Sequence, residues 1–123
     1  MKDYSIGIDI VENNQIQKAI KQFGNTFLKR VFHPLEIRDC KNVKFYAAMF
    51  AAKEAFLKAL GTGWVKGINW NEIEVKLSGL KNIQVILHGK TRNKARQKGI
   101  KNIFGSVSID GNCAISQVIV ERI

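Results

Sequence analysis

The stretch from Phe50 to Gly63, FAAKEAFLKALGTG, most constrains how this chain can fold, because it continues a helical pattern that begins before it. Apolar residues fall on one stripe at spacings of three, four and seven positions, as on one face of an α-helix. These residues are Val43, Ala47, Phe50, Leu57 and Leu60. The same stripe carries Glu54. Since burying an unpaired carboxylate is costly, we expect Glu54 to be neutralised, paired or bound to a cation.

The end of this helix has the features of a ligand site. Lys58 follows Glu54 by four positions and can pair with it across one helical turn. The helix then stops at Gly61-Thr62-Gly63, where glycine supplies a left-handed cap and lets the backbone approach a ligand closely. The pattern indicates a polar ligand held against the end of the helix.

Composition predicts a single folded domain spanning residues 1–123, with one modest core. A formal net charge of +10 indicates an anionic partner, which can be nucleic acid, a phosphorylated metabolite, an acidic protein or a membrane surface. Cys40 and Cys113 lack metal-binding spacing and are expected to be reduced packing residues. Neither a signal-peptide pattern nor a run of about 20 apolar residues is present, which predicts a soluble cytoplasmic protein without a membrane segment.

Near the start, Tyr4 to Val11 reads as a strand with period-two alternation. One face carries Ile6, Ile8 and Ile10, and the other carries Gly7, Asp9 and Val11. Aspartate is disfavoured inside such a β-branched run. Asp9 is therefore either a strand-end residue that caps a turn, or a carboxylate for metal binding or proton transfer.

Helices are predicted next. Asn13 or Asn14 can cap a helix that runs to Phe23. Its expected inner face is Ile16, Ala19, Ile20 and Phe23. A second helical piece covers residues 25–32, and Pro34 suits the first turn of a third helix. His33 is interpreted as a capping or surface histidine rather than a catalyst.

Beyond Gly63 the period changes from 3.6 to 2, which predicts a hairpin of residues 73–77 and 83–87. A final hairpin is expected from residues 106–109 and 113–123, joined by a type I′ turn at Asp110-Gly111. Between the hairpins, the basic run from Lys90 to Lys101 is either a solvated helix or a nucleic-acid arm. This order of elements favours an α+β fold.

Asp9 and Glu54 stand out as two carboxylates that only the fold could bring together. Two acids, waters and a phosphate form the oxygen ligand set that Mg²⁺ prefers. Lys58 and the loop glycines would complement phosphate oxygens. This chemistry permits transfer at a phosphorus centre. The sequence contains no P-loop, Rossmann glycine pattern, H-E-x-x-H or G-x-S-x-G motif.

Three segments carry a specific resemblance: IGIDIVE at residues 6–12, FAAKEA at 50–55 and KALGTG at 58–63. In these segments the chain resembles holo-[acyl-carrier-protein] synthase, the small bacterial branch of the 4′-phosphopantetheinyl transferases, and the match extends nearly end to end. The resemblance implies the 4′-phosphopantetheinyl transferase fold, a small antiparallel sheet packed against a long central helix and shorter helices.

The resemblance also implies an activity, namely Mg²⁺-dependent transfer of 4′-phosphopantetheine from coenzyme A to a serine of apo acyl-carrier protein, for fatty-acid biosynthesis. Adenosine 3′,5′-bisphosphate would be released. Asp9 and Glu54 match the acids that hold the metal, and Lys58 matches a lysine beside the pyrophosphate. Together they form the expected catalytic set. The general base is left open between a metal-bound water and a nearby carboxylate.

Coenzyme A contacts are expected from Lys44, Lys58, Gly61, Gly63 and Ser106. The family is trimeric with active sites shared between subunits, and the first helix and the surface near Lys29 and Arg30 would meet the acidic carrier protein. Neither nucleic acid nor membrane is expected as a partner.

Three positions depart from the family pattern. The family commonly has arginine where this chain has Met49 and Gln15, and many members have histidine where it has Ile109. These departures concern the nucleotide end of coenzyme A and carrier docking. The rival interpretation is a basic nucleic-acid or acidic-protein binding module without catalysis, which accounts for the charge but leaves Asp9 and Glu54 without a role.

Overall fold

The computed structural model describes residues 3–61, 66–78 and 82–123. The elements follow in the order β1 (Asp3–Glu12), α1 (Asn13–Phe23), α2 (Asn25–Val31), α3 (Pro34–Asp39), α4 (Val43–Ala59), the short 3₁₀ helix η1 (Trp70–Glu72), β2 (Ile73–Ser78), β3 (Asn82–Leu87), α5 (Gly89–Gln97), β4 (Ile100–Asp110) and β5 (Cys113–Arg122). No helix among the described residues has the length and apolar character needed to cross a membrane.

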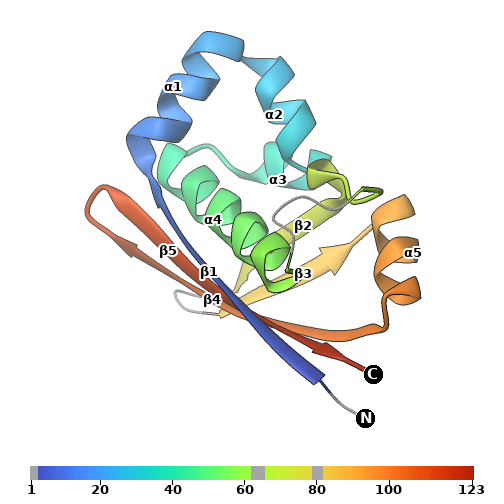
Figure 1. Ribbon diagram of the computed structural model, residues 1–123. Helices are drawn as coiled ribbons and strands as arrows, with labels where there is room; N and C mark the ends of the chain where they lie inside the picture. Colours follow the sequence, from blue (N-terminus) through green and yellow to red (C-terminus); the bar gives the residue numbers. More distant parts are fainter. Residues whose placement is uncertain (1–2, 62–65, 79–81) are drawn as a thin grey trace.

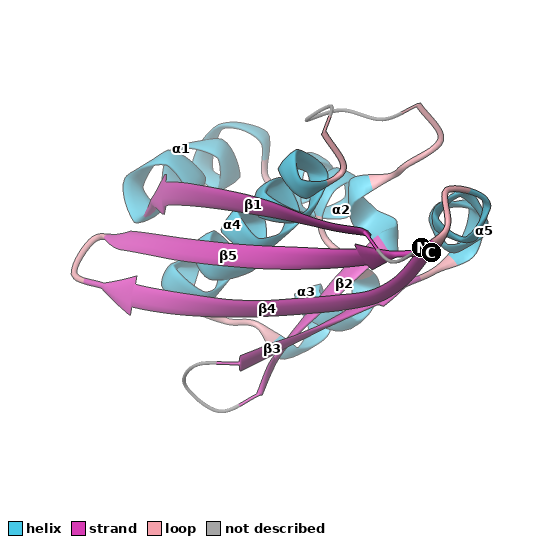
Figure 2. Ribbon diagram, turned by 60° about the horizontal axis from the view of Figure 1, so that its bottom comes forward, coloured by secondary structure: helices cyan, strands magenta, loops and turns pink. Residues whose placement is uncertain are grey.

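The strands form one antiparallel sheet in the order β1-β5-β4-β3-β2. Helix α4 lies across one face of this sheet, chiefly against β1 and β5, and α1 to α3 gather around its other side (Figure 1). The opposite face of β1, β5 and β4 carries no helix among the described elements (Figure 2). The predicted α+β class and the small antiparallel sheet on a long central helix are confirmed.

Strand β1 turns its isoleucines away from the core. Ile6, Ile8 and Ile10 are 61%, 57% and 63% exposed, whereas Gly7 and Val11 on the other face are buried against α4. The alternation in the sequence separates these two faces but does not say which one is buried. Here the face that carries Asp9 is the inner one.

A close approach of β1 to α4 explains this choice. A Cβ atom built on Gly7 would overlap the carbonyl oxygen of Ala55 and lie 2.6 Å from the amide nitrogen of Ala59. Both are backbone atoms of α4, so only glycine fits here without moving the strand from the helix. On the side of α4, the residues at this contact are Ala55 and Ala59, which are almost completely buried. Their small side chains also allow the strand to lie close to the helix.

Most helices and hairpins lie where the sequence predicts them. The hairpin of β2 and β3 is confirmed. The basic run is helical only as far as Gln97 in α5, whereas Lys101 belongs to β4, and most of its Lys and Arg side chains are exposed. His33 caps α3 as expected, since its Nδ1 accepts a hydrogen bond from the Leu35 amide at 3.1 Å. Cys40 and Cys113 are free thiols.

Some local predictions are wrong. The first helix has Glu12 as its N-cap and no side-chain cap, and Phe23 is 56% exposed rather than on the inner face. The final turn consists of Gly111 and Asn112, one position later than predicted, because Asp110 still pairs with Cys113. Type I′ requires positive φ at both central residues, and Asn112 has none, so this turn resembles type II′ with glycine first.

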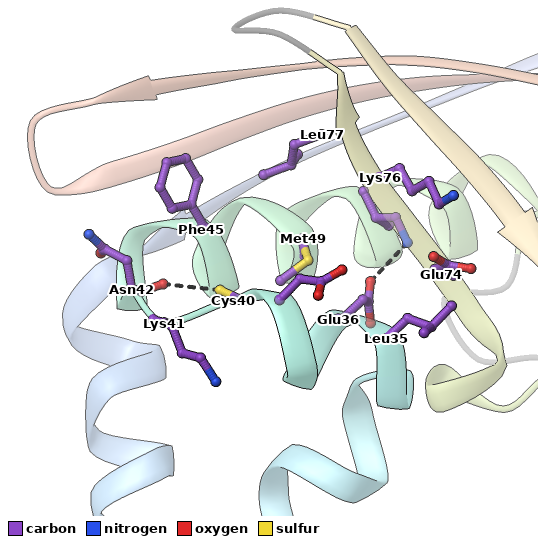
Figure 3. Close-up of a pocket in the computed structure, with 12 residues that line it drawn as sticks. Leu35, Glu36, Cys40, Lys41, Asn42, Phe45, Met49, Glu74, Lys76 and Leu77 are labelled. Carbon is purple, nitrogen blue, oxygen red and sulfur yellow. Dashed lines mark hydrogen bonds between the residues drawn. The ribbon is translucent and has the colours of Figure 1, made fainter.

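Lys53 is fully buried in α4 and makes an ion pair that the helical stripe did not reveal. Its Nζ lies 2.6 Å from Oε1 of Glu36 and also donates to the carbonyl oxygens of Val31 and Trp70. Glu36 in turn accepts from the amides of His33 and Val75, the latter bond drawn in Figure 3. Burial lowers the pKa of Lys53 to about 8, although Glu36 opposes this shift. The pair joins α4, α3 and β2.

Replacing Lys53 by methionine is therefore expected to destabilise the fold by about 3–5 kcal/mol, because Glu36 would keep a buried charge without its partner. Urea unfolding at fixed protein concentration measures this loss. The double variant Lys53→Met with Glu36→Gln should recover part of it, since neither charge remains. Lys44→Met is the matched control for an exposed lysine of the same helix, expected to cost less than about 1 kcal/mol. A Lys53→Met variant as stable as this control contradicts the prediction.

Candidate active site

Asp9, Glu54 and Lys58 come together where β1 crosses α4. Nζ of Lys58 lies 2.8 Å from Oδ1 of Asp9 and donates to the carbonyl oxygen of Ile8 at 3.3 Å. Glu54 lies one turn before Lys58 on α4. Burial raises the pKa of Glu54, and the negative charge of Asp9 raises it further, whereas Lys58 lowers it. The two carboxylates that the sequence singled out are thus electrostatic neighbours.

Lys58 pairs with a different acid from the one first expected. Spacing along the helix suggested Glu54 as its partner, but the ion pair is with Asp9, 49 positions earlier in the chain. Asp9 also raises the pKa of Lys58, chiefly through this hydrogen bond. The result leaves the Glu54 carboxylate without a hydrogen bond to any described residue.

The donor set suits a hard divalent cation. Two carboxylates contribute only oxygen atoms. Burial and the repulsion from Asp9 raise the pKa of Glu54, and a cation between the two carboxylates would relieve that repulsion. Asp9 is largely buried, whereas the Lys58 side chain is half exposed, so the site opens to solvent on the lysine side. A phosphate group arriving from that side would meet both the lysine and the cation.

Comparison with known protein families identifies the superfamily of this chain. The model of the 4′-phosphopantetheinyl transferase superfamily matches residues 5–110. The chain belongs to that superfamily. The matched range contains most of β1, including Asp9, and all of α4, so Asp9, Glu54 and Lys58 lie within it.

Relatives within the superfamily match over nearly their entire length. Holo-[acyl-carrier-protein] synthases from Geotalea daltonii and Geobacter sp. (strain M21) are 37% and 40% identical to this chain, each over 97% of it and 98% of the relative. Among solved structures, the holo-[acyl-carrier-protein] synthase of Neisseria meningitidis is 30% identical with a TM-score of 0.84, covering 94% of this chain and 96% of that one. The Helicobacter pylori enzyme, solved in complex with coenzyme A, is 34% identical with a TM-score of 0.80, covering 94% and 98%.

The other predicted site residues are dispersed in the phosphopantetheinyl transferase fold. Gly61 follows Leu60, the C-cap of α4, and has a φ of 91°, as the predicted left-handed cap requires. Gly63 lies outside the described residues. Lys44 lies in the first turn of α4, about 15 Å along the helix axis from Glu54 at 1.5 Å per residue. Within one chain, Lys44 therefore does not reach the carboxylates.

Ser106 lies on the opposite face of the sheet from Asp9. It pairs with Gln117 of β5, which pairs with Ile8, so these residues share the exposed face of the sheet. Asp9 belongs to the neighbouring row with Ser116 on the inner face. The structure brings Asp9, Glu54 and Lys58 together and separates both Lys44 and Ser106 from them.

A pocket of about 520 Å³ lies between α3, α4 and β2 (Figure 3). Its lining includes Cys40, Lys41, Phe45, Met49 and Leu77 but none of Asp9, Glu54 and Lys58. Met49, where a departure from the family pattern is expected, is almost fully buried here. Its thioether contributes apolar surface to the pocket and cannot form an ionic contact with an anionic ligand.

Sequence reasoning missed the residue that brings the site together. Gly7 lets β1 approach the backbone of α4 two positions before Asp9 and beside Ala55. A glycine isolated inside a β-branched run is a recognised signal of a close backbone approach, and the segment IGIDIV contains it. The partner of this approach, in contrast, lies 48 to 52 positions away and has no local signature.

Proposed function

We propose that this protein is a holo-[acyl-carrier-protein] synthase, which transfers 4′-phosphopantetheine from coenzyme A to a serine of apo acyl-carrier protein. The observation that carries the proposal is the Asp9–Glu54–Lys58 cluster in a chain of this superfamily. Full-length relatives with that name, and solved relatives in complex with coenzyme A, support it.

Asp9 and Glu54 would hold Mg²⁺, which fits their oxygen-only donor set and their mutual repulsion. When bound, such an ion neutralises charge on the phosphate oxygens. Lys58, anchored by Asp9 and half exposed, would contact the pyrophosphate of coenzyme A and neutralise the leaving group.

The reaction balances as a displacement at phosphorus. The serine hydroxyl of the carrier gives its proton to a general base, either water or a nearby carboxylate, and its oxygen forms a bond to the phosphorus that bears the pantetheine arm. The bond from that phosphorus to the bridging pyrophosphate oxygen breaks, and adenosine 3′,5′-bisphosphate leaves with the electron pair. The role of the chain is to orient the donor and to stabilise negative charge.

The carrier protein would dock beside the site on a basic surface. Lys29 and Arg30 line a pocket of about 920 Å³ together with Phe50 and Trp70. Phe50 precedes Glu54 by one helical turn, so this pocket lies along the same face of α4 as Glu54. Exposed cations at its rim would attract an acidic carrier and speed its encounter with the enzyme.

Mass spectrometry of an apo carrier protein tests this function directly. Incubation with the full chain, coenzyme A and Mg²⁺ is expected to add the phosphopantetheine mass to the carrier, and a carrier whose acceptor serine is replaced by alanine should stay unmodified. An unmodified native carrier, together with steeply salt-dependent binding to generic RNA or DNA, would favour the basic binding module instead.

We also propose that the active enzyme is a homotrimer that buries the exposed face of the sheet. Large apolar side chains cover this face: Tyr4, Ile6, Ile8, Ile10, Phe104 and Ile115. A contiguous apolar patch of this kind marks an interface. The outward position of Ser106 supports shared sites, because from that face it can contact coenzyme A bound to a neighbouring copy. Lys44, remote from the carboxylates of its own chain, would act in the same way.

Ile8→Glu is expected to break this assembly, because it places an unpaired carboxylate in the centre of the apolar face. Light scattering after size exclusion should give three times the chain mass of 13.9 kDa for the wild type and a single chain mass for the variant. Carrier modification should be lost in parallel. Gln97→Glu, on the exposed side of α5, is the matched control and should remain trimeric. A wild type that is monomeric yet active overturns the shared-site proposal.

A further inference from the structure

The two histidines of the chain stack on each other beside a buried glutamate. The ring centroids of His33 and His88 are 4.2 Å apart, with an angle of 23° between the ring planes. Nε2 of His88 lies 2.8 Å from Oε1 of Glu74. One ligand atom from each of His33, Glu74 and His88 lies within 4.8 Å of the other two.

These three side chains come from separate segments. His33 caps α3, Glu74 belongs to β2, and His88 directly follows β3. Glu74 is only 3% exposed, and His88 is its hydrogen-bond partner among the described residues. Because an imidazole ring is the one hydrogen-bond partner of this buried carboxylate among the described residues, a metal cation bound here would compensate its charge more fully.

The surrounding charges favour a cation. The ammonium group of Lys53 acts electrostatically on both His33 and Glu74, but it already forms a 2.6 Å ion pair with Glu36. With neutral imidazoles, the carboxylates of Glu36 and Glu74 leave one net negative charge beside Lys53. His33 and His88 are both partly exposed, which provides a path from solvent.

We propose that His33, Glu74 and His88 form a second metal site, which takes a transition-metal dication of the zinc class. Two imidazole nitrogens and one carboxylate oxygen are ligands that Zn²⁺ and Co²⁺ accept and that Mg²⁺ does not favour. The fourth position would be open to water. Bound metal would tie the start of α3 to β2 and to the end of β3, next to the buried Lys53–Glu36 pair.

Binding requires local rearrangement. For Zn–N bonds of about 2.0–2.1 Å in a tetrahedral site, ligand atoms lie about 3.4 Å apart, so the side chains must close on the metal by rotation. Nδ1 of His33 accepts the cap bond from the Leu35 amide, so metal binding through Nδ1 displaces this bond. Binding through Nε2 moves the ring proton to Nδ1 and gives up the same bond. Losing such a cap weakens binding by roughly fivefold.

Titration of the full chain with Co²⁺, followed by its visible absorption bands, tests this site. Excess Mg²⁺ occupies the oxygen ligands of Asp9 and Glu54, and a reductant keeps the thiols reduced. We expect one Co²⁺ per chain with bands typical of nitrogen and oxygen ligands, displaced by Zn²⁺, and a melting temperature raised by saturating Zn²⁺. Imidazole proton signals should shift for both histidines.

Two variants separate metal binding from folding. In His33→Asn, the amide oxygen can still cap α3, and in His88→Gln the amide can still donate to Glu74, but each change removes a metal-binding nitrogen. Each should weaken Co²⁺ binding at least about tenfold. Cys40→Ser with Cys113→Ser, and separately Asp9→Asn, should leave it unchanged. The proposal is overturned if the wild type shows no saturable Co²⁺ binding, or if His88→Gln binds Co²⁺ as tightly as the wild type. It is also overturned if the cysteine double variant or Asp9→Asn loses Co²⁺ binding.

Discussion

Asp9→Asn and Glu54→Gln are each expected to lower turnover roughly 10²-fold or more, with coenzyme A and carrier protein both saturating. The two carboxylates are electrostatically coupled, and we propose that they act as one metal-binding unit. Effects within such a unit are not additive, so the double variant should be little slower than the more impaired single variant. Steady-state kinetics with a carrier-modification readout measures this.

The same variants should remain folded. Burial and Asp9 raise the pKa of Glu54, so the folded state disfavours its ionised form. At a pH between the unfolded and the folded pKa of Glu54, the folded state holds a proton that the unfolded state has lost. The free energy of unfolding therefore falls as the pH rises through this interval. Above it, and without metal, the charged Glu54 makes the folded state less stable. Glu54→Gln removes that penalty, so its melting temperature at pH 7 should equal or exceed that of the wild type.

Metal dependence provides a readout that does not involve activity. Added Mg²⁺ should raise the melting temperature of the wild type and have little effect on either single variant. Near-wild-type turnover of Asp9→Asn or Glu54→Gln, or undiminished stabilisation by Mg²⁺ in both, would show that these carboxylates do not hold the metal.

Gly7→Ala is expected to lower both stability and activity. The added Cβ would overlap backbone atoms of α4 at Ala55 and Ala59, which cannot rotate away as a side chain can. Overpacking of this kind costs about 3 kcal/mol or more, equivalent to roughly 10 °C in melting temperature for a domain of this size. Moving β1 from α4 would also separate Asp9 from Glu54, so the remaining folded protein should turn over more slowly.

Gly105→Ala is the matched control for this change. Gly105 is also a strand glycine without positive φ, but its added Cβ would first meet the end of the Ile83 side chain at 2.7 Å, which can change rotamer. We expect a loss of less than about 1.5 kcal/mol and normal kinetics. Thermal melts and carrier-modification rates of Gly7→Ala and Gly105→Ala test this difference. Equal melting temperatures and equal rates in the two variants would contradict a special role for Gly7.

Local features of the sequence were sufficient to place most of the elements and to recognise the family. Period-two and period-3.6 patterns, the His33-Pro34 start of α3 and the glycine after α4 depend on residues within a few positions of one another, which constrain the backbone directly. The segments around Asp9, Glu54 and Lys58 are also contiguous, so the resemblance to the phosphopantetheinyl transferases could be recognised without a fold. That family assignment is confirmed.

Only the tertiary structure decided how these pieces meet. The alternation in β1 cannot tell the inner face from the outer one, and the close approach at Gly7 rather than hydrophobicity makes the Asp9 face the inner one. Lys58 pairs with Asp9 across 49 positions, and Lys53 pairs with Glu36 across 17. Such pairs depend on how α4 packs against the sheet and the short helices, and neither spacing nor composition encodes that packing. The local motifs of the sequence are therefore enough to select Asp9, Glu54 and Lys58 as catalytic candidates. Which charged residues form ion pairs is decided only by the packing of α4 against the sheet and the short helices.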